Sequence, residues 1–299
     1  MMLRHIEGVL LSSANTMTGK TCLVTGANSG IGKEIARGLA ADGSRVLMVA
    51  RSRERGEAAR ADVAASTENP SVEILICDLS SQRQVRELAA QVLDRCDRLD
   101  LLINNAGLTL GRRTLTEDGI ETTFAVNHLA PILLTNLLRE RLEASAPARI
   151  VTVASEAHRG VEIDFDDPGG EREFSGWRAY QQSKLANILF TAELARRLQG
   201  TKVTATCLHP GVVRTGFGRQ GPAFIRFGTR IAGMFLLSPT KGADTAIWLA
   251  SSPDVEGASG GYYEKRRLAN PSRAARDPVA ATRLWELSER MVGLAPAKS

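Results

Sequence analysis

Residues 25–32 read TGANSGIG and follow directly on the apolar run KTCLVT at residues 20–25. Three glycines thus stand where a buried strand would turn into a helix. Glycine permits a tight turn and a close backbone approach, and the first N–H groups of a helix attract phosphate. The stretch therefore predicts a dinucleotide-binding turn, with a glycine turn of purely structural use as the alternative. Its candidate cofactor-binding residues are Gly26, Asn28, Ser29, Gly30, Ile31 and Gly32.

Outward from this turn, apolar runs of strand length alternate with longer amphipathic runs. The predicted strands are 20–25, 45–50, 72–77, 99–104, 148–154, 202–208 and a short one at 260–264, and the predicted helices are 31–41, 53–65, 82–96, 116–145, 177–199 and 241–251. Strands that are apolar throughout are typical of a parallel sheet covered on both faces. We therefore expect an α/β fold, a Rossmann-type doubly wound parallel sheet of about seven strands with helices on both faces.

The composition is that of an ordinary globular protein. Of 299 residues, 43% are hydrophobic and 24% are charged, and the net charge is +5. A mild basic excess permits an anionic ligand but does not indicate nucleic acid, and the basic cluster at 265–267 lacks the aromatic residues that stack on bases. Neither an internal repeat nor a long linker divides the chain. We expect an N-terminal arm at residues 1–18 and one oxidoreductase domain at residues 19–299.

The spacing of the cysteines and histidines indicates whether the chain has disulfides or a metal site, and the lengths of its apolar stretches indicate whether it crosses a membrane. The four cysteines are far apart, and the four histidines lack metal-ligand spacing, so we expect neither a disulfide framework nor a metal site. His128 and His158 are interpreted as structural or exposed rather than catalytic. Uncharged apolar stretches stay below the roughly 18 residues of a membrane span, and the N-terminus lacks the pattern of a secretion signal. These patterns predict a cytoplasmic protein with no transmembrane segment.

The end of the second predicted strand bears on which dinucleotide binds. An enzyme that prefers NAD usually places an acid there, which accepts a hydrogen bond from the ribose 2′-hydroxyl. Here Arg51 and Ser52 follow the strand. Arg51 can pair with a 2′-phosphate and Ser52 can donate to it, so NADP(H) is preferred over NAD(H); the alternative is that Arg51 is a solvated surface charge. Asp78, followed by Leu79 after the third strand, could bond adenine or cap the next helix.

The run YQQSK at residues 180–184 places Tyr180 and Lys184 four residues apart, on one face of a predicted helix. A phenol with a pKa near 10 is a poor base at neutral pH, and a nearby ammonium is expected to lower that pKa. Ser155 ends the fifth predicted strand, and ligands of such sheets bind beyond the carboxyl ends of the strands. The three side chains are therefore candidates for one catalytic site.

Six motifs, in this order, resemble those of the short-chain dehydrogenase/reductase superfamily: TGANSGIG, NNAG at 104–107, Asn127 in VNHL, Ser155, YQQSK, and HPGVVRT at 209–215. The chain is similar in particular to the branch of the retinol dehydrogenases and the WW-domain-containing oxidoreductase, in the stretches GIGKEIARGLA, LTEDGIETTFAVNHLAPILLTNLL, SKLANILFTAELARRL and LWELSE. The resemblance implies an NAD(P)-dependent oxidoreductase that acts on an alcohol or a carbonyl.

The resemblance also implies a role for each motif residue. Tyr180 is then the general acid/base, Lys184 tunes its pKa and holds the nicotinamide ribose, and Ser155 stabilises the substrate oxygen. Asn127 would hold a water that links Lys184 to a proton relay, and the alternative is that it caps or kinks its helix. The further cofactor contacts that the resemblance implies are Asn104, Asn105, Ala106, Gly107, Pro210, Gly211, Val212, Val213 and Thr215.

Residues 214–240 are rich in large apolar side chains and predict a substrate loop. A flexible apolar cover suits a lipophilic carbonyl or alcohol, such as a retinoid-like, steroid-like or fatty-aldehyde-like compound. Packing of a surface helix is the alternative. We also expect a C-terminal helix at about 277–292.

Functions of other classes remain open at this point. One is an NADP(H)-binding regulatory protein with incidental reductase activity, and another is a nucleic-acid binder, which the charge pattern disfavours. An epimerase or dehydratase is disfavoured by the glycine spacing and the short C-terminal part. The sequence leaves the direction of the reaction open, and the chain could be a monomer or a homo-oligomer.

Overall fold

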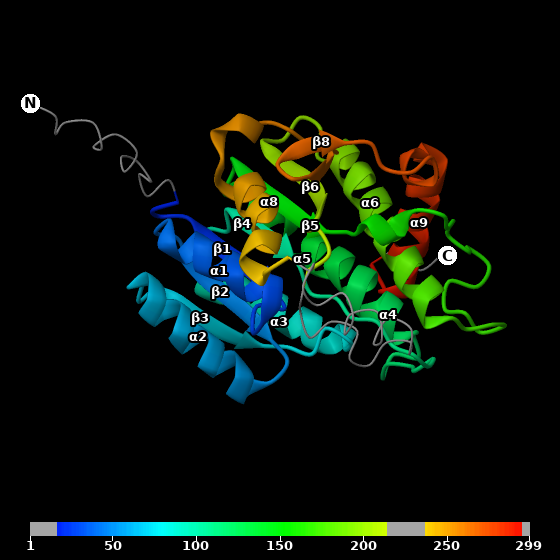
Figure 1. The fold of residues 1–299 in the computed structure, drawn as a ribbon, viewed down its shortest axis with the longest axis horizontal. Helices are drawn as coiled ribbons and strands as arrows, with labels where there is room; N and C mark the ends of the chain where they lie inside the picture. The colour runs from blue at the N-terminus through cyan, green and yellow to red at the C-terminus, as the bar shows by residue number, and fades with distance from the viewer. Residues whose placement is uncertain (1–16, 214–236, 295–299) are drawn as a thin grey trace, which may run out of the picture.

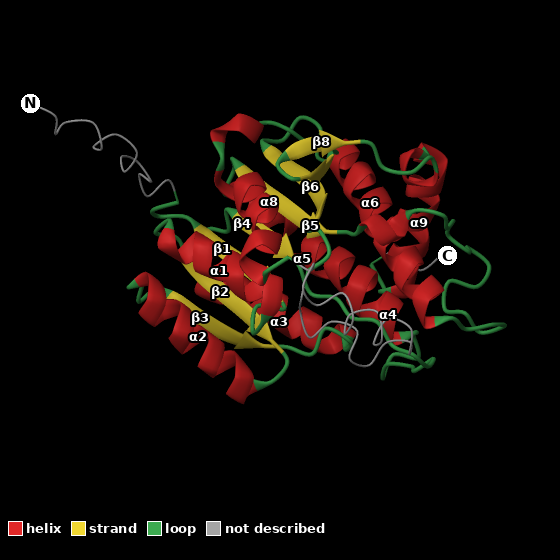
Figure 2. Ribbon diagram, in the orientation of Figure 1, coloured by secondary structure: helices red, strands yellow, loops and turns green. Residues whose placement is uncertain are grey.

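A computed structural model describes residues 17–213 and 237–294 of the chain. Within these residues, eight strands form one sheet in the order β3-β2-β1-β4-β5-β6-β7-β8, with helices on both faces (Figures 1 and 2). The strands are β1 Thr21–Thr25, β2 Arg45–Ala50, β3 Val72–Ile76, β4 Leu101–Asn104, β5 Ala148–Val153, β6 Val203–His209, β7 Tyr262–Glu264 and β8 Arg267–Ala269. Neighbouring strands from β3 to β7 pair in parallel. The predicted doubly wound α/β fold is confirmed.

The eighth strand is a difference from the expected seven. β8 is short and mostly exposed, and it pairs antiparallel with β7 across a two-residue turn. The turn residues, Lys265 and Arg266, have φ angles of 50° and 59°, in the left-handed region that such tight hairpins need. Asparagine and glycine are the usual residues at these two positions. The hairpin therefore lacks the sequence signal by which it could have been predicted.

The helices follow the strands as expected from the alternating pattern. They are α1 Gly30–Ala41, α2 Arg53–Thr67, α3 Gln82–Arg95, α4 Thr122–Phe124, α5 Ala130–Ala144, α6 Gly176–Arg197, α8 Pro239–Ser251 and α9 Pro278–Met291. Among the described residues, none of these helices has the length and apolar character needed to cross a membrane.

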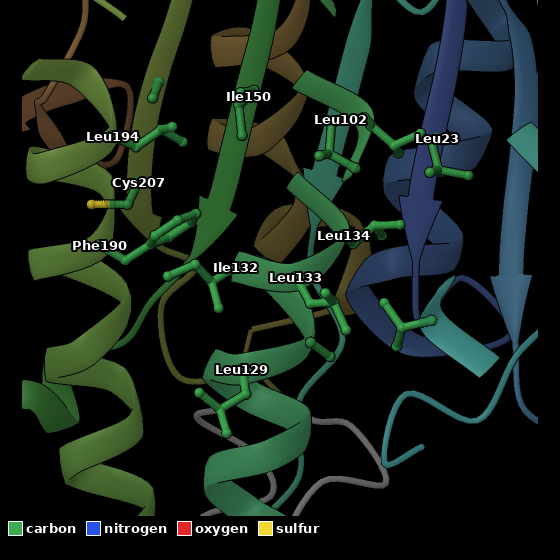
Figure 3. Close-up of a cluster of buried hydrophobic side chains, with 14 of the residues drawn as sticks. Leu23, Leu102, Leu129, Ile132, Leu133, Leu134, Ile150, Phe190, Leu194 and Cys207 are labelled. Atoms are coloured by element: carbon green, nitrogen blue, oxygen red, sulfur yellow. The ribbon is translucent and has the colours of Figure 1, made fainter. Parts of the chain in front are cut away.

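Each face of the sheet has its own hydrophobic core. Cys22 and Val24 of β1 pack with α1, α2 and α8, whereas Leu23 between them packs with α3, α5, α6 and α9. Figure 3 shows the second core, in which Leu23 and Leu102 of the sheet face Leu133 of α5. Because successive side chains of a strand point to opposite faces, burial of both faces requires strands that are apolar throughout. This is the physical reason for the continuous apolar runs in the sequence.

The predicted helix at 116–145 begins later than expected. Residues 115 and 121 form an isolated antiparallel bridge, and Gly119 between them has a φ of 74°. The Glu121 carboxylate then caps α4 by accepting hydrogen bonds from the N–H groups of Thr123 and Phe124, both at 2.8 Å. The apolar periodicity runs through this hairpin-like turn, so it did not reveal where the helix starts.

The connections of the sheet place its switch point between β1 and β4. The chain runs outward from β1 through β2 to β3 and then returns to β4 on the other side of β1. In sheets of this kind, ligands bind at the carboxyl ends of the strands beside the switch point. The glycine turn after β1 and the NNAG run after β4 meet there.

Candidate active site

The glycine turn leaves the carboxyl end of β1 and leads into α1. Gly26 and Gly30 have φ angles of 66° and 56°, a left-handed backbone that favours glycine. A Cβ on Gly32 would lie 2.3 Å from Asn105 Nδ2, and one on Gly26 would lie 2.9 Å from the backbone of the loop after β4. Ser29 is the N-cap of α1, and among the described residues its side chain makes no capping hydrogen bond. The first N–H groups of α1 therefore keep their capacity to bind an anion.

Thr25 and Asn105 tie the glycine turn to the loop after β4. Thr25 Oγ1 accepts hydrogen bonds from the N–H groups of Asn105 at 3.0 Å and Ala106 at 3.1 Å. Asn105 Nδ2 in turn donates to the Thr25 carbonyl at 2.8 Å. Asn104, one residue earlier, is buried and donates to Thr135 Oγ1 at 3.1 Å. Asn105 and Ala106 thus lie beside the turn, whereas the Asn104 side chain points into the core.

The residues after β2 lie at the start of α2. Arg51 is exposed, and within the described ranges its guanidinium makes no ion pair. Ser52 is the N-cap of α2, and its Oγ accepts from the Arg55 N–H at 3.4 Å. On α1, Lys33 pairs with Asp62 of α2 at 2.7 Å, so much of its charge is already neutralised. Arg51 is therefore one of the exposed cations at this end of β2, where Arg53 and Arg55 are also exposed.

Asp78 and Leu79 follow β3. Asp78 Oδ1 accepts hydrogen bonds from Ser80 N at 3.0 Å and Ser80 Oγ at 2.8 Å, which forms a local turn. The cap of α3 is Ser81, whose Oγ accepts from Gln84 N at 3.2 Å. The helix-capping alternative for Asp78 is therefore wrong. Leu79 is partly buried against the core.

Ser155 and Tyr180 come from different elements and meet. Ser155 follows β5 and caps a short 3-10 turn at Glu156–His158, where its Oγ accepts from the Ala157 N–H at 3.2 Å. Tyr180 in α6 is buried, and its side chain is hydrogen-bonded to that of Ser155. Burial raises the pKa of Tyr180 to about 12, and the bond to Ser155 offsets part of the rise. The lowering of this pKa predicted from the sequence is wrong here, because desolvation dominates.

Lys184 lies one helical turn after Tyr180 and is buried. Its Nζ donates to the carbonyl of Val153, the last residue of β5, at 2.9 Å and lies 5.7 Å from the centroid of the Tyr180 ring. Asn187 Nδ2, on the same helix, donates to the same carbonyl at 3.4 Å. Burial lowers the pKa of Lys184 to about 8, so the ammonium form still prevails at pH 7.

Asn127 lies in a π-helical segment, Ala125–Leu129, between α4 and α5. A π turn inserts one residue into the helical winding, so the helix changes its course at Asn127. The side chain is fully buried: its Oδ1 accepts from Leu108 N at 2.8 Å, and its Nδ2 donates to Leu108 O and Ser183 Oγ, both at 2.9 Å. A Cβ on Gly107 would lie 3.5 Å from Asn127 Oδ1 and 3.3 Å from Lys184 Nζ. Asn127, Gly107 and Lys184 are thus close neighbours.

Comparison with known proteins accounts for this arrangement. A family model described as short chain dehydrogenase matches residues 20–223. The chain belongs to the short-chain dehydrogenase family. Human retinol dehydrogenase 13 is 43% identical over 298 residues, which cover 97% of this chain and 89% of that protein. The resemblance to the retinol dehydrogenase branch is confirmed.

Two solved structures are also similar to this short-chain dehydrogenase. One is an uncharacterised protein of Mycobacterium paratuberculosis, with a TM-score of 0.74, 35% sequence identity, and coverage of 92% of this chain and 94% of that one. The other is a short chain dehydrogenase of Burkholderia cenocepacia J2315 in complex with NADP, with a TM-score of 0.66, 28% identity, and coverage of 83% of this chain and 96% of that one. The protein is thus an NAD(P)-dependent oxidoreductase that acts on alcohols or carbonyls.

The residues of this short-chain dehydrogenase fit a nicotinamide dinucleotide. The left-handed turn at Gly26 and Gly30 brings backbone rather than side chains to the start of α1, and Gly26 and Gly32 leave no room for a Cβ. Both features bring backbone N–H groups within reach of a pyrophosphate. The loop after β4 and the Tyr180–Lys184 face of α6 lie at the same end of the sheet, because Lys184 Nζ binds the last residue of β5 and lies 3.3 Å from where a Cβ on Gly107 would be.

The segment after β6 forms another wall at this end. Gly211 has a φ of 84°, and a Cβ there would lie 2.5 Å from Leu237 Cδ1. Val213 bridges to Leu237, whose N–H donates to the Val212 carbonyl at 2.9 Å. Thr215, and the substrate loop except for its end at 237–240, lie outside the described residues. The predicted contacts that the structure describes in this segment are Pro210, Gly211, Val212 and Val213.

Several residues that hold the site in this family member were not predicted from its sequence. Thr25, Ser183 and Asn187 bind the loops and the carbonyl described above, through contacts that join distant parts of the chain. Trp177 contacts Tyr180 with ring centroids 5.7 Å apart. Its position three residues before Tyr180 is a local signal, because residues at that spacing share a helix face. Ser183 and Asn187 follow Tyr180 and Lys184 at the same spacing, but their hydrogen-bond partners Asn127 and Val153 are distant in the sequence.

Proposed function

We propose that this short-chain dehydrogenase uses NADP(H) in preference to NAD(H) to interconvert a lipophilic alcohol and its carbonyl compound. The proposed catalytic residues are Ser155, Tyr180, Lys184 and Asn127. The observation that carries the proposal is the hydrogen-bonded pair of Ser155 and Tyr180, with the Lys184 ammonium 5.7 Å from the phenol ring, at the carboxyl end of the sheet.

In the proposed reaction, the protein transfers one proton to or from the substrate oxygen and stabilises the negative charge that develops on that oxygen. The bound nicotinamide supplies or accepts the hydride. In reduction, the Tyr180 phenol donates its proton to the substrate oxygen, and in oxidation the phenolate takes that proton back. Ser155 Oγ donates a hydrogen bond to the same oxygen and stabilises its negative charge. Since burial raises the pKa of Tyr180, the phenol is protonated at pH 7, the form that reduction needs.

Lys184 and Asn127 would assist proton transfer by Tyr180 without contacting the substrate oxygen. The Lys184 ammonium favours the phenolate by its positive charge once the proton has left, and it would also hold the nicotinamide ribose. Its position is fixed by the Val153 carbonyl at 2.9 Å. Asn127 ties the loop that contains Gly107 to α6 through Leu108 and Ser183. It would thereby hold the loop and α6 in register and place a water for the proton relay.

The preference for NADP(H) is supported by the charges after β2. Arg51 is exposed and unpaired among the described residues, and the β2 end itself carries no carboxylate that would repel a 2′-phosphate. Ser52 could add a hydroxyl donor. The relative from Burkholderia cenocepacia was solved with NADP. The remaining proposed contacts are the glycine turn with Asn28, Ser29 and Ile31 for the pyrophosphate, Asp78 and Leu79 for the adenine, Asn105 to Gly107 for the ribose, and residues 210–215 for the nicotinamide.

A lipophilic substrate is supported by exposed apolar residues in the segment after β6 and next to Tyr180. Val212, which follows β6, is 66% exposed. Trp177 lies against Tyr180 and is partly exposed. The human relative is named a retinol dehydrogenase, which is consistent with an apolar alcohol. Reduced, buried cysteines are consistent with the proposed cytoplasmic location.

Tyr180→Phe tests the proposal, because it removes the phenol oxygen and keeps the ring. We expect its turnover of a panel of lipophilic aldehydes, ketones and alcohols to fall at least about a hundred-fold with both cofactors. Affinity for NADPH, measured by quenching of protein fluorescence, should stay within about three-fold. Tyr263→Phe is the control, because it removes the same atom from another buried tyrosine and should keep full activity.

Three results would contradict the proposal in different ways. Full activity of Tyr180→Phe would exclude Tyr180 as the acid. Equal use of both cofactors by the wild type would exclude the NADP(H) preference. Binding of NADPH without turnover of any compound would favour the alternative, a regulatory protein with incidental reductase activity.

A further inference from the structure

His158 joins Ser155 to a distant part of the chain. It ends the 3-10 turn that Ser155 caps, and its side chain is fully buried. Its Nδ1 lies 2.7 Å from the Ser155 carbonyl oxygen, and its Nε2 lies 3.0 Å from the backbone nitrogen of Ser272. The ring also packs edge-on against Tyr262, with centroids 5.3 Å apart.

The two partners determine where the imidazole proton lies. The Ser272 backbone N–H can only donate, so Nε2 must accept and carries no proton. The Ser155 carbonyl can only accept, so Nδ1 must carry the proton and donate it. The ring is therefore neutral in the Nδ1–H form. Burial lowers the pKa of His158, which keeps it neutral at pH 7.

The Ser155 carbonyl thus receives two hydrogen bonds from one residue, because the His158 backbone N–H also donates to it at 3.2 Å. These bonds hold the Ser155 backbone at φ −164° and ψ 155°. The same conformation lets Ser155 Oγ accept from Ala157 N and leaves its hydroxyl hydrogen for another acceptor. The direction of that hydroxyl therefore depends on how the Ser155 carbonyl is held.

We propose that neutral His158 is a positioning residue, which uses its Nδ1–H bond to the Ser155 carbonyl to aim the Ser155 hydroxyl at the substrate oxygen. This inference rests on the proposed function, in which Ser155 stabilises that oxygen. The bond from Ser272 to Nε2 fixes the ring, so the segment before α9 supports the active site from outside it. In the same turn, the Glu156 carboxylate accepts a hydrogen bond from the Tyr262 hydroxyl at 3.0 Å and forms an ion pair with Arg159.

Two substitutions separate the two bonds of the ring. In His158→Asn, the amide nitrogen can take the place of Nδ1 and donate to Ser155, while the bond from Ser272 is lost. In His158→Gln, the longer side chain can present its amide oxygen to Ser272, while the donor to Ser155 is lost. Ser272→Ala is the control, because it keeps the backbone N–H that binds the ring and removes only the hydroxyl that caps Ala275.

We expect both histidine variants to melt at a lower temperature, because each loses one buried hydrogen bond. In His158→Gln, kcat should fall roughly ten- to hundred-fold, as for a misaligned catalytic group. In His158→Asn, kcat should stay within about three-fold of the wild type. The Kd for NADPH should be unchanged in both, and Ser272→Ala should keep the wild-type kcat. Nitrogen-15 NMR of the wild type should show the Nδ1–H tautomer.

Failure of this inference can be told from failure of the proposed function. An active wild type whose two histidine variants lose kcat equally, or in proportion to their melting temperatures, would overturn the inference alone. An Nε2–H tautomer or a charged ring at pH 7 would also overturn it. A wild type that binds NADPH but turns over no alcohol or carbonyl would overturn the proposed function, and the role of His158 with it.

Discussion

Lys184 carries a buried charge whose stability cost is set by its surroundings. Burial lowers its pKa from the ordinary 10.5 to about 8, so the folded protein disfavours the ammonium relative to the unfolded chain. For a lysine shifted in this direction, the cost is fully present below pH 8 and fades as the pH rises from 8 towards 10.5. The hydrogen bond to Val153 returns only part of this cost.

Lys184→Met should therefore stabilise the cofactor-free protein while it abolishes turnover. We expect an increase of about 1–2 kcal/mol in the free energy of unfolding at pH 7, after subtraction of the lost hydrogen bond. Urea unfolding of the wild type and the variant at pH 7 and pH 9.5 measures the difference in the free energy of unfolding. The increase in the variant should be smaller at pH 9.5. Lys202→Met, at an exposed position, should leave stability unchanged. A variant less stable than the wild type at both pH values would contradict this interpretation.

Arg51 is the residue at which the proposed cofactor preference can be changed. Arg51→Asp replaces the exposed guanidinium with a carboxylate that repels a 2′-phosphate and can accept from a 2′-hydroxyl. The ratio of Kd for NADH to Kd for NADPH should fall roughly ten- to hundred-fold, the value of a charge-assisted hydrogen bond. Fluorescence titration with both cofactors measures the ratio.

A matched control separates this contact from a change in overall charge. Arg60→Asp changes the net charge equally, further along α2, where Arg60 pairs with Glu57. It should leave the ratio of the two Kd values unchanged. If both variants shift the ratio by the same factor, Arg51 makes no specific contact with the 2′-phosphate.

At the scale of elements, the end of α2 is less stable than it could be. Its C-cap, Glu68, has a φ of 53°, in the left-handed region where an L side chain is strained. Glu68→Gly should raise the free energy of unfolding by about 0.5–1 kcal/mol, because glycine adopts this conformation without strain. Chemical denaturation at neutral pH is the measurement.

A glycine introduced in the middle of α2 should instead lower the free energy of unfolding. Ala61 is exposed in the middle of the helix, and Ala61→Gly should lower stability by about 1 kcal/mol, the difference in helix propensity. A loss of stability in Glu68→Gly as well would show that the Glu68 side chain makes contacts that outweigh its backbone strain.

The elements that the sequence predicts well are those whose pattern is set locally. The strands and most helices follow from apolar runs and from periodicity. The π-helical segment at Asn127 has no such pattern, because it depends on contacts of Asn127 with the distant Leu108 and Ser183. The turn at Gly119 is closed by a local bridge between residues 115 and 121, which the apolar pattern does not mark. The predicted helix was therefore correct in its body and wrong at its start.

At the scale of the whole molecule, α9 packs on α6 and buries part of the hydrophobic core on that face of the sheet. Trp285 of α9 stacks on Phe190 of α6 with ring centroids 5.7 Å apart, and the Arg197 guanidinium lies 4.4 Å from the Trp285 ring centroid. Ser288 of the same helix lies 2.8 Å from Nε2 of the buried His128. The C-terminal helix is therefore part of the structure that supports Asn127 and α6.

Trp285→Ala should be strongly destabilising. Trp285 is only 2% exposed, so we expect a loss of about 3–5 kcal/mol in the free energy of unfolding. Trp248→Ala, in the partly exposed face of α8, should cost clearly less. Thermal and urea unfolding give both values. Equal losses in the two variants would contradict the proposed contribution of α9 to the core.

The sequence by itself determined the order of strands and helices, the glycine turn, and the residue types of the candidate site, because each depends on neighbours a few positions away. It also indicated the family, since six motifs occur in the family's order. Only the tertiary structure decided the raised pKa of Tyr180 and the hydrogen bonds that hold the side chains of Asn127 and Lys184. It also decided the hydrogen bonds of His158 with Ser155 and Ser272. Burial and hydrogen bonds between distant segments exist only after the sheet has brought those segments together, and no local pattern records them.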